Sequence, residues 1–584
     1  MFVLVAVFLG LTSNSYSRDD KPKFIWSVAD SKTDIAPGIV YFRKSFKTPN
    51  AESTTLEITC DDGYRVYVNG KLVGRNTAWQ TVARYDIQSL LGEQENVIAV
   101  HAENASKSPA GLYAKITWKS GKTTQSLGTN RSWKFSKSPK AGWRFPKYDD
   151  SGWSDSFEQG EFGKVLPWAN RFTYESKPPV SPAPQKTKLA RNAFELVNGD
   201  RIVFVGSTFI ERLQSNDYLE TLITSQFSHL DLKFRNLGWS GDNVFGLSRA
   251  VFGNQADGFR RLENDLLVAD PTLTIVCYGL NESFRGKEYL PTFLAGLEQL
   301  VTLLRSNQSD ILFISPMLME NLGPPLPDPR TQNQNIKMYT AAIRKYASAN
   351  GCGFIDNLKP LGSTGFSKTD VPAIRDRLTE NGMHLTEYGH WRMAPQLTNK
   401  LGGSSANCQF EIDLQHNLFS AVGSTIHSIS FENALVKFSA KDDRLLESPP
   451  PKFKPRGGKM MATHDQIKIS GLQPGNYGLQ INGKPSSVAN EKQWAAGVLI
   501  NRSYYVDQPE KLRAMILKKN EMFFHRYRPQ NETYLYLFRK HEQGNNAVEI
   551  PQFDPIIAEF EKTISSLKKP EVIHYQLQRI TSSQ

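Results

Sequence analysis

Two adjacent hydroxyl residues and a distant histidine provide the side chains that acyl transfer requires. Ser207 and Thr208 follow the apolar run 201–205 and precede a helical pattern. A hydroxyl at such a turn lies near a helix N-terminus, where free backbone N–H groups favour negative charge. His384 also follows a turn and precedes a helix, and a histidine can take a proton from a hydroxyl and return it. These residues predict attack on an acyl carbon with histidine as the base.

Three further residues are suited to support this chemistry. Gly241 belongs to a glycine-containing turn after a second strand, and its backbone N–H can be offered to an oxyanion. Asn281 follows a third strand, where its side-chain amide would be a second donor. Asn381 stands three positions before His384 and can orient the ring. Taken singly, each position is more typical of a βα turn, where Gly and Asn are common, so the prediction rests on their combination.

The elements that must position these residues alternate between strand and helix over residues 196–402. Strands are expected at 201–205, 233–237, 273–277, 311–315 and 353–356, and helices at 211–227, 257–268, 290–305 and 331–349. Such alternation predicts a parallel sheet with helices on both faces. Ligands of these sheets bind beyond the carboxyl ends of the strands, which is where the candidate residues lie.

The order and placement of these segments resemble the SGNH (GDSL-type) hydrolase superfamily. Its members carry a Gly-Asp-Ser block with a Glu five residues after the Gly, a Gly-containing block, Gly-x-Asn-Asp, and Asp-x-x-His. Gly206 and Glu211 set the register of the first block here, and Gly241, Asn281 and His384 match the others. The resemblance covers about 200 residues. It implies a flavodoxin-like α/β/α three-layer sandwich and ester hydrolysis, with no cofactor and no metal.

Four positions depart from the family pattern. In register, Ser207 replaces the family's Asp and Thr208 replaces its nucleophilic Ser, while Asn381 replaces the Asp that orients the histidine. Glu282 stands at the Asp of the third block. Threonine can act as a nucleophile, but its branched Cβ limits χ1 and crowds the attack. Asn381 can hold the histidine by a hydrogen bond, but it cannot stabilise an imidazolium by charge.

The resemblance implies a mechanism and leaves two alternatives. His384 would take the proton of Thr208, whose oxygen attacks an ester carbonyl, while Gly241 and Asn281 hold the oxyanion. Ser207 is the second candidate nucleophile. Because two triad positions differ, the alternative is a catalytically degenerate SGNH-fold protein that binds glycan. A third possibility is a cell-surface scaffold that acts through its β-sandwiches.

The residues before this region read as all-β. Short β-rich runs with turns such as Asn69-Gly70 fill residues 20–175, and most of the ten Trp fall there. A β-sandwich is expected, and it resembles the galactose-binding-like sandwiches of secreted bacterial glycan-active enzymes. Some of its tryptophans are candidates for stacking on sugar rings, with the sandwich core as the alternative place for each: Trp79, Trp133, Trp143 and Trp153. A Pro-rich linker is expected at 176–192.

The residues after the hydrolase-like region form a mixed β/α segment. Residues 403–507 look like a β-rich insertion or domain, and 508–584 look helical. The stretch 523–542 is dense in polar and aromatic residues and has no zinc-protease spacing. We expect it to complete a wall of the site if Arg528 or His541 approaches Thr208, and otherwise to be a solvated face.

Composition restricts the partners and the compartment. The net charge of +12 is spread over the 584 residues, which does not favour nucleic-acid binding. The four cysteines are far apart and make no metal or redox motif. Residues 1–17 resemble a signal peptide, although no Lys or Arg precedes the apolar run. The expected protein is secreted or periplasmic, acts on an acylated carbohydrate or another ester, and is not stably inserted in a membrane. An uncleaved N-terminal anchor is the alternative.

Overall fold

The computed structural model describes residues 21–176, 188–189, 194–357, 377–403, 408–451 and 465–580, apart from 77, 94, 105–106, 138, 140–141, 308 and 433. The chain divides into two units, Met1–Ala183 and Pro184–Gln584. The expected signal peptide and most of the expected linker lie outside the described residues.

The first unit is a β-sandwich of two mostly antiparallel sheets. Their strand orders are β12-β1-β8-β3-β6-β13, with β9 beside β8, and β11-β10-β2-β7-β4-β5. The strands are β1 (Lys23–Trp26), β2 (Gly38–Phe46), β3 (Ser53–Asp61), β4 (Gly63–Val68), β5 (Lys71–Asn76), β6 (Thr81–Asp86), β7 (Asn96–Asn104), β8 (Gly111–Ser120), β9 (Thr123–Gly128), β10 (Lys134–Ser136), β11 (Ser154–Asp155), β12 (Phe157–Glu161) and β13 (Thr173–Ser176). Leu56 and Ile58 of β3 share one buried cluster with Val66, Ile98 and Val100 of the other sheet, because alternate side chains of a strand face the same side.

Burial decides between the two roles expected for the tryptophans of this unit. Trp133 and Trp143 are buried, so they belong to the core and stacking on a sugar is excluded for them. Trp79 and Trp153 are partly exposed, and for these two a sugar contact stays a prediction.

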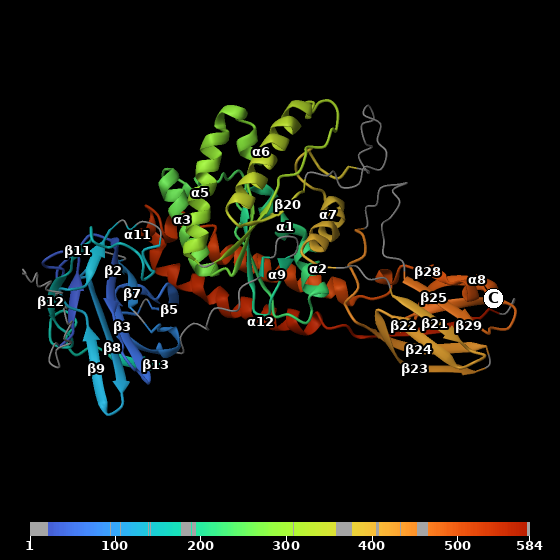
Figure 1. Cartoon of the computed structure of the whole chain (residues 1–584), viewed down its shortest axis with the longest axis horizontal. Helices are drawn as coiled ribbons and strands as arrows, with labels where there is room; N and C mark the ends of the chain where they lie inside the picture. The colour runs from blue at the N-terminus through green and yellow to red at the C-terminus, as the bar shows by residue number, and fades with distance from the viewer. Residues whose placement is uncertain are drawn as a thin grey trace, which may run out of the picture. The chain divides into compact units, whose positions relative to one another are not determined.

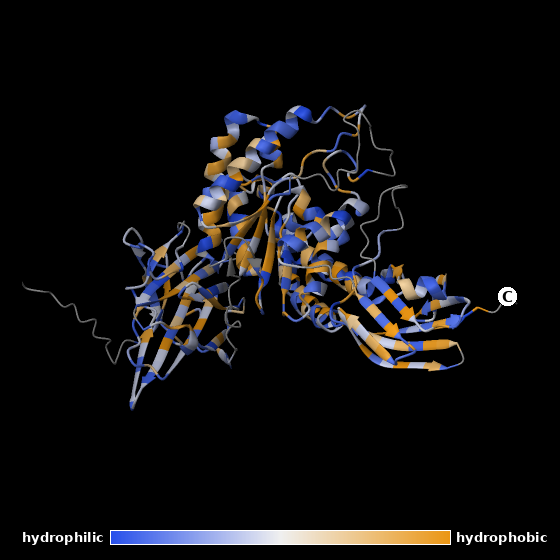
Figure 2. Ribbon diagram, turned by 45° about the vertical axis from the view of Figure 1, so that its right-hand side comes forward, coloured by the Kyte–Doolittle hydropathy of each residue, from blue (hydrophilic) through white to orange (hydrophobic). Residues whose placement is uncertain are grey.

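The second unit contains a five-stranded parallel sheet in the order β17-β16-β18-β19-β20 (Figure 1). Its strands are β16 (Arg201–Gly206), β17 (Lys233–Asn236), β18 (Leu273–Cys277), β19 (Asp310–Ile314) and β20 (Gly353–Ile355), all paired in parallel. The order reverses at β16, as in flavodoxin-like sheets. The sheet is hydrophobic along its strands (Figure 2), which is typical of a sheet covered on both faces.

Alternate residues of β16 show why helices cover both faces. Ile202 and Phe204 pack in a cluster with α1, α2 and α7, while Val203 and Val205 pack with α3, α5 and α6. The α/β/α fold class is therefore confirmed. The helices of these layers are α1 (Thr208–Asn216), α2 (Tyr218–Gln226), α3 (Gln255–Ala269), α4 (Leu280–Ser283), α5 (Leu290–Ser306), α6 (Arg330–Ala349) and α7 (Glu387–Lys400).

The single helix expected at 211–227 is wrong, because the structure has two helices there. Asp217 separates α1 from α2 and adopts a left-handed backbone with φ 49°, which Asp tolerates better than most residues. Its buried carboxylate accepts a hydrogen bond from Asn520 of helix α9 (Gln508–Tyr527) at 3.0 Å. The break therefore depends on a partner about 300 residues away, which local periodicity does not reveal.

The C-terminal part contains a second pair of sheets. The orders are β22-β21-β25-β28 and β23-β24-β29-β26-β27. The strands are β21 (Gln409–Asp413), β22 (Leu418–Val422), β23 (Ser424–Glu432), β24 (Leu435–Asp442), β25 (Asp465–Ser470), β26 (Asn476–Ile481), β27 (Lys484–Asn490), β28 (Val498–Ile500) and β29 (Val572–Arg579). Strand β29 corrects the expectation that 508–584 is helical. Its buried residues Ile573, Tyr575 and Leu577 alternate, a period of two that marks a strand.

Two long C-terminal helices cover the edge of the parallel sheet. Helices α9 (Gln508–Tyr527) and α12 (Phe553–Leu567) pack on each other, and α9 also contacts edge strand β17. Arg235 of β17 pairs with Glu561 of α12 at 2.6 Å, and the Lys519 ammonium donates to the Phe234 carbonyl at 3.3 Å. A covered edge cannot pair with another chain. The shorter helices are α8 (Glu491–Ala496), α10 (Glu532–Leu535) and α11 (Lys540–Gln543).

Among the described residues, no helix has the length and hydrophobicity to cross a membrane.

Candidate active site

The two candidate hydroxyls lie at the junction of β16 and α1. Ser207 is the N-cap residue of α1 and has an extended backbone, but its hydroxyl does not cap the helix. Instead its Oγ accepts a hydrogen bond from Asn281 Nδ2 at 2.8 Å. Thr208 Oγ1 accepts one from the Gly241 N–H at 3.1 Å. Each hydroxyl therefore contacts one of the two predicted oxyanion donors.

Close backbone packing explains the glycines around this junction. A Cβ on Gly206 would lie 2.4 Å from the carbonyl oxygen of Cys277, and one on Gly238 would lie 2.2 Å from the backbone nitrogen of Glu211. Gly241 has φ +75°, a conformation that glycine adopts without steric cost. Glycine at these positions lets the turn after β17 pack against the start of α1.

Glu211 holds this turn in place. One carboxylate oxygen accepts the Ser240 N–H, so the residue before Gly241 is tied to α1. The other oxygen pairs with Arg528 Nη1 at 3.1 Å, and the Arg528 guanidinium lies 3.7 Å from the centre of the Trp239 ring. A hydrogen bond to an ionised carboxylate is stronger than one between neutral groups.

The C-terminal helix α9 thus contributes to the site. Besides Arg528, which follows it, the Tyr527 hydroxyl donates to the Gly238 carbonyl at 2.9 Å. Arg528 thus contacts Glu211, and among the described residues it makes no hydrogen bond or ion pair with Thr208. His541 is exposed and lies 3.8 Å from Glu542, and no hydrogen bond or ion pair joins it to the described residues of the site.

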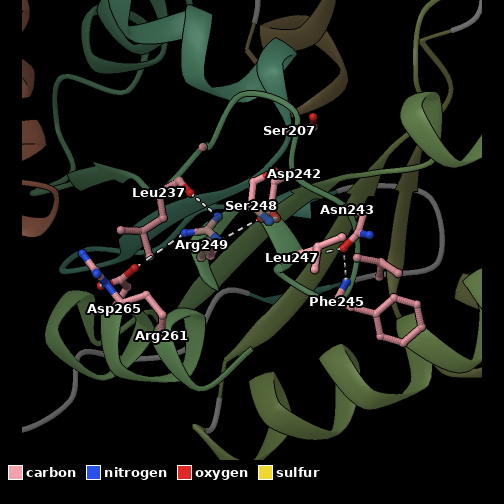
Figure 3. A network of polar contacts seen from close by, with 12 residues as sticks. Ser207, Leu237, Asp242, Asn243, Phe245, Leu247, Ser248, Arg249, Arg261 and Asp265 are labelled. Atoms are coloured by element: carbon pink, nitrogen blue, oxygen red, sulfur yellow. Dashed lines mark hydrogen bonds and ion pairs between the residues drawn. The ribbon is translucent and has the colours of Figure 1, made fainter. Parts of the chain in front are cut away.

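A buried ion pair supports the same turn from below (Figure 3). Asp242 accepts from Arg249 Nε at 2.8 Å and from the Tyr278 hydroxyl at 3.1 Å. Arg249 also donates to the Leu237 carbonyl at 2.6 Å. Both charged side chains are fully buried, and burial raises the pKa of Asp242. The Asp242 carbonyl accepts from Asn281 Nδ2 at 2.8 Å, so this pair also fixes the second oxyanion donor.

Glu282 has a structural position. It is buried, and its two oxygens accept the N–H groups of Val244 at 2.8 Å and Gly279 at 2.9 Å. Burial raises its pKa. The residue at the family's Asp position therefore joins the second and third loops, and among the described residues it makes no hydrogen bond with either hydroxyl.

The hydrogen bonds of Asn381 determine the protonation of His384. Asn381 Oδ1 accepts the N–H groups of Met383 and His384 at 3.2 and 3.0 Å. This orientation leaves Nδ2, which is only a donor, facing His384 Nδ1 at 3.3 Å. The neutral imidazole must then accept at Nδ1 and carry its proton on Nε2. A base that receives a hydroxyl proton at Nε2 needs the opposite tautomer.

The environment of His384 keeps the ring uncharged. Partial burial lowers its pKa, the charge of Arg212 lowers it further, and Glu380 opposes them. Arg212 and Glu380 pair with each other at 2.9 Å. Because the lowered pKa lies below the ordinary histidine value of about 6.5, the imidazole is neutral at pH 7.

The predicted residues fall into two groups in the structure. Ser207, Thr208, Gly241 and Asn281 are joined by hydrogen bonds. His384 is bonded to Asn381. Within the described part of the chain, no hydrogen bond joins the His384 ring to either hydroxyl, so the expected histidine–hydroxyl contact does not select between Thr208 and Ser207.

Sequence reasoning missed the buried support of the site. Asp242 directly follows Gly241, but the sequence alone indicates no role for it, and Arg249 belongs to no motif. A charged residue within seven positions of the Gly241–Asp242 turn was the available signal. Burial, which decides its role, is not visible in sequence.

Known proteins resemble parts of the chain. Residues 199–392 match the model of the GDSL-like lipase/acylhydrolase family. An α-L-rhamnosidase of Streptomyces avermitilis is 30% identical over 161 residues, which are 25% of this chain and 16% of the rhamnosidase. The chain thus spans only a small part of that relative's length.

Solved structures give the fold. A gut microbial diltiazem-metabolizing enzyme is 16% identical, with a TM-score of 0.53 over 66% of this chain and 98% of that chain. An acetyl-xylooligosaccharide esterase variant from Geobacillus is 19% identical, with a TM-score of 0.27 over 36% of this chain and 97% of that one, too weak a likeness to carry an argument. The family match and the parallel sheet show that residues 199–392 form a GDSL-like lipase/acylhydrolase domain with the SGNH hydrolase fold.

Proposed function

We propose that the chain hydrolyses a carboxylic ester of a carbohydrate, with Thr208 as the nucleophile. The observation that carries this proposal is the hydrogen bond between Thr208 Oγ1 and the Gly241 N–H at 3.1 Å. An oxygen that attacks from this position forms its tetrahedral intermediate beside Gly241 N–H and the Asn281 amide. Donors fixed before the reaction stabilise the developing charge most effectively.

The proposed reaction has two steps. The Thr208 proton passes to His384 Nε2 as Oγ1 bonds to the acyl carbon, and the imidazolium returns that proton to the leaving alcohol. Water then attacks the acyl-enzyme and gives a proton to the same nitrogen. The imidazolium passes this proton to Thr208 Oγ1 as the acyl–oxygen bond breaks, which releases the carboxylic acid and restores Thr208. The imidazole must first change tautomer and lose its hydrogen bond from Asn381, which costs about 0.5–1.5 kcal/mol. Ester turnover is therefore expected to be slow.

The carbohydrate part of the proposal rests on the 30% identity with an α-L-rhamnosidase. We also propose that the protein is exported, because residues 1–17 resemble a signal peptide. N-terminal sequencing of protein recovered outside the cytoplasm tests the export. A mature chain that still begins at Met1 would contradict cleavage.

Release of acetate from acetylated oligosaccharides tests the catalytic proposal. Thr208→Ala and His384→Ala should each lower the rate by at least about 100-fold, whereas Ser207→Ala should retain most of it. Unchanged rates in the first two variants would refute the assignment. Loss of activity in Ser207→Ala alone would transfer the nucleophile to Ser207.

A second function is favoured by the Asn381–His384 hydrogen bond. This bond places the Nε2 proton where a base needs a lone pair, as expected for a site that binds without reacting. The same domain would then bind glycan without hydrolysing it. Glycan binding with no ester turnover, unchanged by Thr208→Ser, would support this function over the first.

A further inference from the structure

A cleft of about 810 Å³ lies beside the candidate active site in the second unit. Its walls come from α1, from the segment that carries His384 and the start of α7, and from α9. Helix α9 lies outside the GDSL-like match at 199–392. The cleft is therefore built partly by a region that this chain adds to the family domain.

The cleft opens next to both halves of the site. Ser240, which lines it, precedes the oxyanion donor Gly241, and Leu385, which also lines it, follows His384. Glu211 and Glu380 also line the cleft. A ligand in this cleft thus lies beside residues that are the sequence neighbours of Gly241 and His384.

Two polar groups in the walls lack a partner. The His390 side chain is 3% exposed and lines the cleft, and its ring makes no hydrogen bond with a described residue. Gln214 Oε1 is also buried without a partner among the described residues. An unpaired buried polar group is unfavourable, so a ligand that enters the cleft and pairs with these two groups is stabilised there.

The charged residues that line the cleft are four carboxylates and two cations: Glu211, Glu380, Glu387 and Glu521, with Arg212 and Lys518. Arg212 pairs with Glu380 at 2.9 Å, and Glu211 pairs with Arg528 at 3.1 Å. Glu387 accepts the Tyr218 hydroxyl at 3.0 Å. The walls therefore lack the excess of cations that a phosphate or sulfate ligand requires.

The remaining lining is amphipathic. Exposed Ser215 and partly buried Asn216 and Gln214 offer hydroxyl and amide groups. The carboxylates of Glu387 and Glu521 offer acceptors. Burial lowers the pKa of His390 to about 4, so its ring is neutral at pH 7 and pairs equally well with a donor or an acceptor. Phe524 and Leu517 add apolar surface. Hydroxyl groups on an apolar ring match this combination, because each hydroxyl both donates and accepts.

We propose that this cleft is a subsite for neutral sugar units of the substrate, beyond the acylated one. The proposal rests on the proposed function for the identity of the substrate, but the binding it describes does not need turnover. Residues from α9 then select the glycan, while the family domain provides the chemistry.

The test is binding of unacylated hexasaccharides to the full chain by calorimetry. Xylohexaose, mannohexaose and cellohexaose are the neutral probes, and a glucosamine hexamer and a galacturonate hexamer are the charged ones. We expect at least one neutral hexamer to bind and both charged ones to bind more weakly. Ser215→Trp fills the cleft from an exposed wall position and should weaken the neutral ligand at least about tenfold. His390→Leu should weaken it as well.

Two controls separate the cleft from the chemistry and from other surfaces of the second unit. His541→Leu, at an exposed position away from the cleft, should leave the affinity unchanged. Hydrolysis of the small ester p-nitrophenyl acetate should stay within about twofold in Ser215→Trp, because this ester does not reach the cleft.

Each outcome decides the proposal. Absence of neutral-hexamer binding, preference for a charged hexamer, or unchanged affinity in Ser215→Trp would overturn it. Loss of binding in Ser215→Trp, in a protein that hydrolyses no ester, would support the cleft and refute the esterase proposal. His390→Leu serves as the second variant only if its circular dichroism matches the wild type, and Ser215→Trp decides the test otherwise.

Discussion

Replacing Asn381 by aspartate should increase ester turnover. In the structure Asn381 Oδ1 already accepts the backbone N–H groups of Met383 and His384. An aspartate in the same position keeps these bonds and places its second oxygen where Nδ2 now lies, 3.3 Å from His384 Nδ1. That oxygen accepts a hydrogen bond from the Nδ1–H, which favours the tautomer whose Nε2 has a lone pair and can act as a base.

The size of the gain follows from two effects. The new carboxylate selects the reactive tautomer, which removes the cost of about 0.5–1.5 kcal/mol for breaking the Asn381–His384 bond. It also stabilises the imidazolium that forms in the reaction. In a serine protease triad, the change from Asp to Asn lowers kcat about 10⁴-fold. Because the His384 ring is only partly buried, solvent screens part of the charge, and we expect an increase of about 10²- to 10⁴-fold.

The assay is kcat/KM for p-nitrophenyl acetate as a function of pH, in wild type and Asn381→Asp. The carboxylate also favours the charged ring, so the pKa of His384 should rise. The acidic limb of the profile should then move to higher pH as the plateau rises. Circular dichroism of both proteins controls for folding, and Asn381→Ala controls for simple loss of the amide.

Two further variants show whether the gain uses the proposed groups. Asn381→Asp combined with His384→Ala, and with Thr208→Ala, should each return to background. An Asn381→Asp protein that folds normally, yet shows neither a faster rate nor a shifted limb, would refute the tautomer argument. A gain that survives the loss of His384 would refute the role of that histidine.

Three other changes have defined expected outcomes. Arg249→Met leaves a fully buried carboxylate without its cation, so the second unit should lose about 3–5 kcal/mol of unfolding free energy, measured by urea titration with circular dichroism at 222 nm. Arg212→Gln removes a charge that lowers the pKa of His384, so the acidic limb of kcat/KM should move to higher pH, whereas Glu380→Gln should move it to lower pH. Burial, aided by a nearby arginine, lowers the pKa of His101 to about 3. Below about pH 6.5 the unfolded state therefore binds a proton at His101 that the native state does not bind. Stability falls as the pH drops from 6.5, and about 2–3 kcal/mol is lost by pH 4.5. In His101→Phe, thermal unfolding at pH 7 and 4.5 should lack this loss.

The sheet and its helices were predictable because their patterns are local. Apolar runs such as 201–205 and 273–277 are short and nearly continuous, as in strands covered on both faces. The break at Asp217 was not predictable, since it depends on Asn520. Strand β29 could have been found, because Ile573, Tyr575 and Leu577 alternate. The helical pattern that precedes it led to the wrong extension.

The candidate site was predictable in part for a similar reason. Gly241 and Asn281 stand directly after strands, so the topology alone brings them to one edge of the sheet. The Arg528–Glu211 pair joins positions more than 300 apart in sequence, and no periodicity connects them. The tautomer of His384 depends on which atom of Asn381 faces the ring, which only the hydrogen bonds of the turn decide.

The departures from the family pattern affect proton transfer more than oxyanion binding. Thr208 Oγ1 already lies 3.1 Å from the Gly241 N–H, and Asn281 is fixed by the Asp242 carbonyl. The Gly241 N–H is thus in place, and the Asn281 amide reaches an oxyanion by exchanging its bond to Ser207 Oγ. The base, in contrast, has the wrong tautomer and no carboxylate. If this division is correct, Thr208→Ser, which only relieves crowding at Cβ, should change kcat/KM less than Asn381→Asp does. The opposite ranking in the p-nitrophenyl acetate assay would mean that attack by the hindered hydroxyl, rather than proton transfer, limits the reaction.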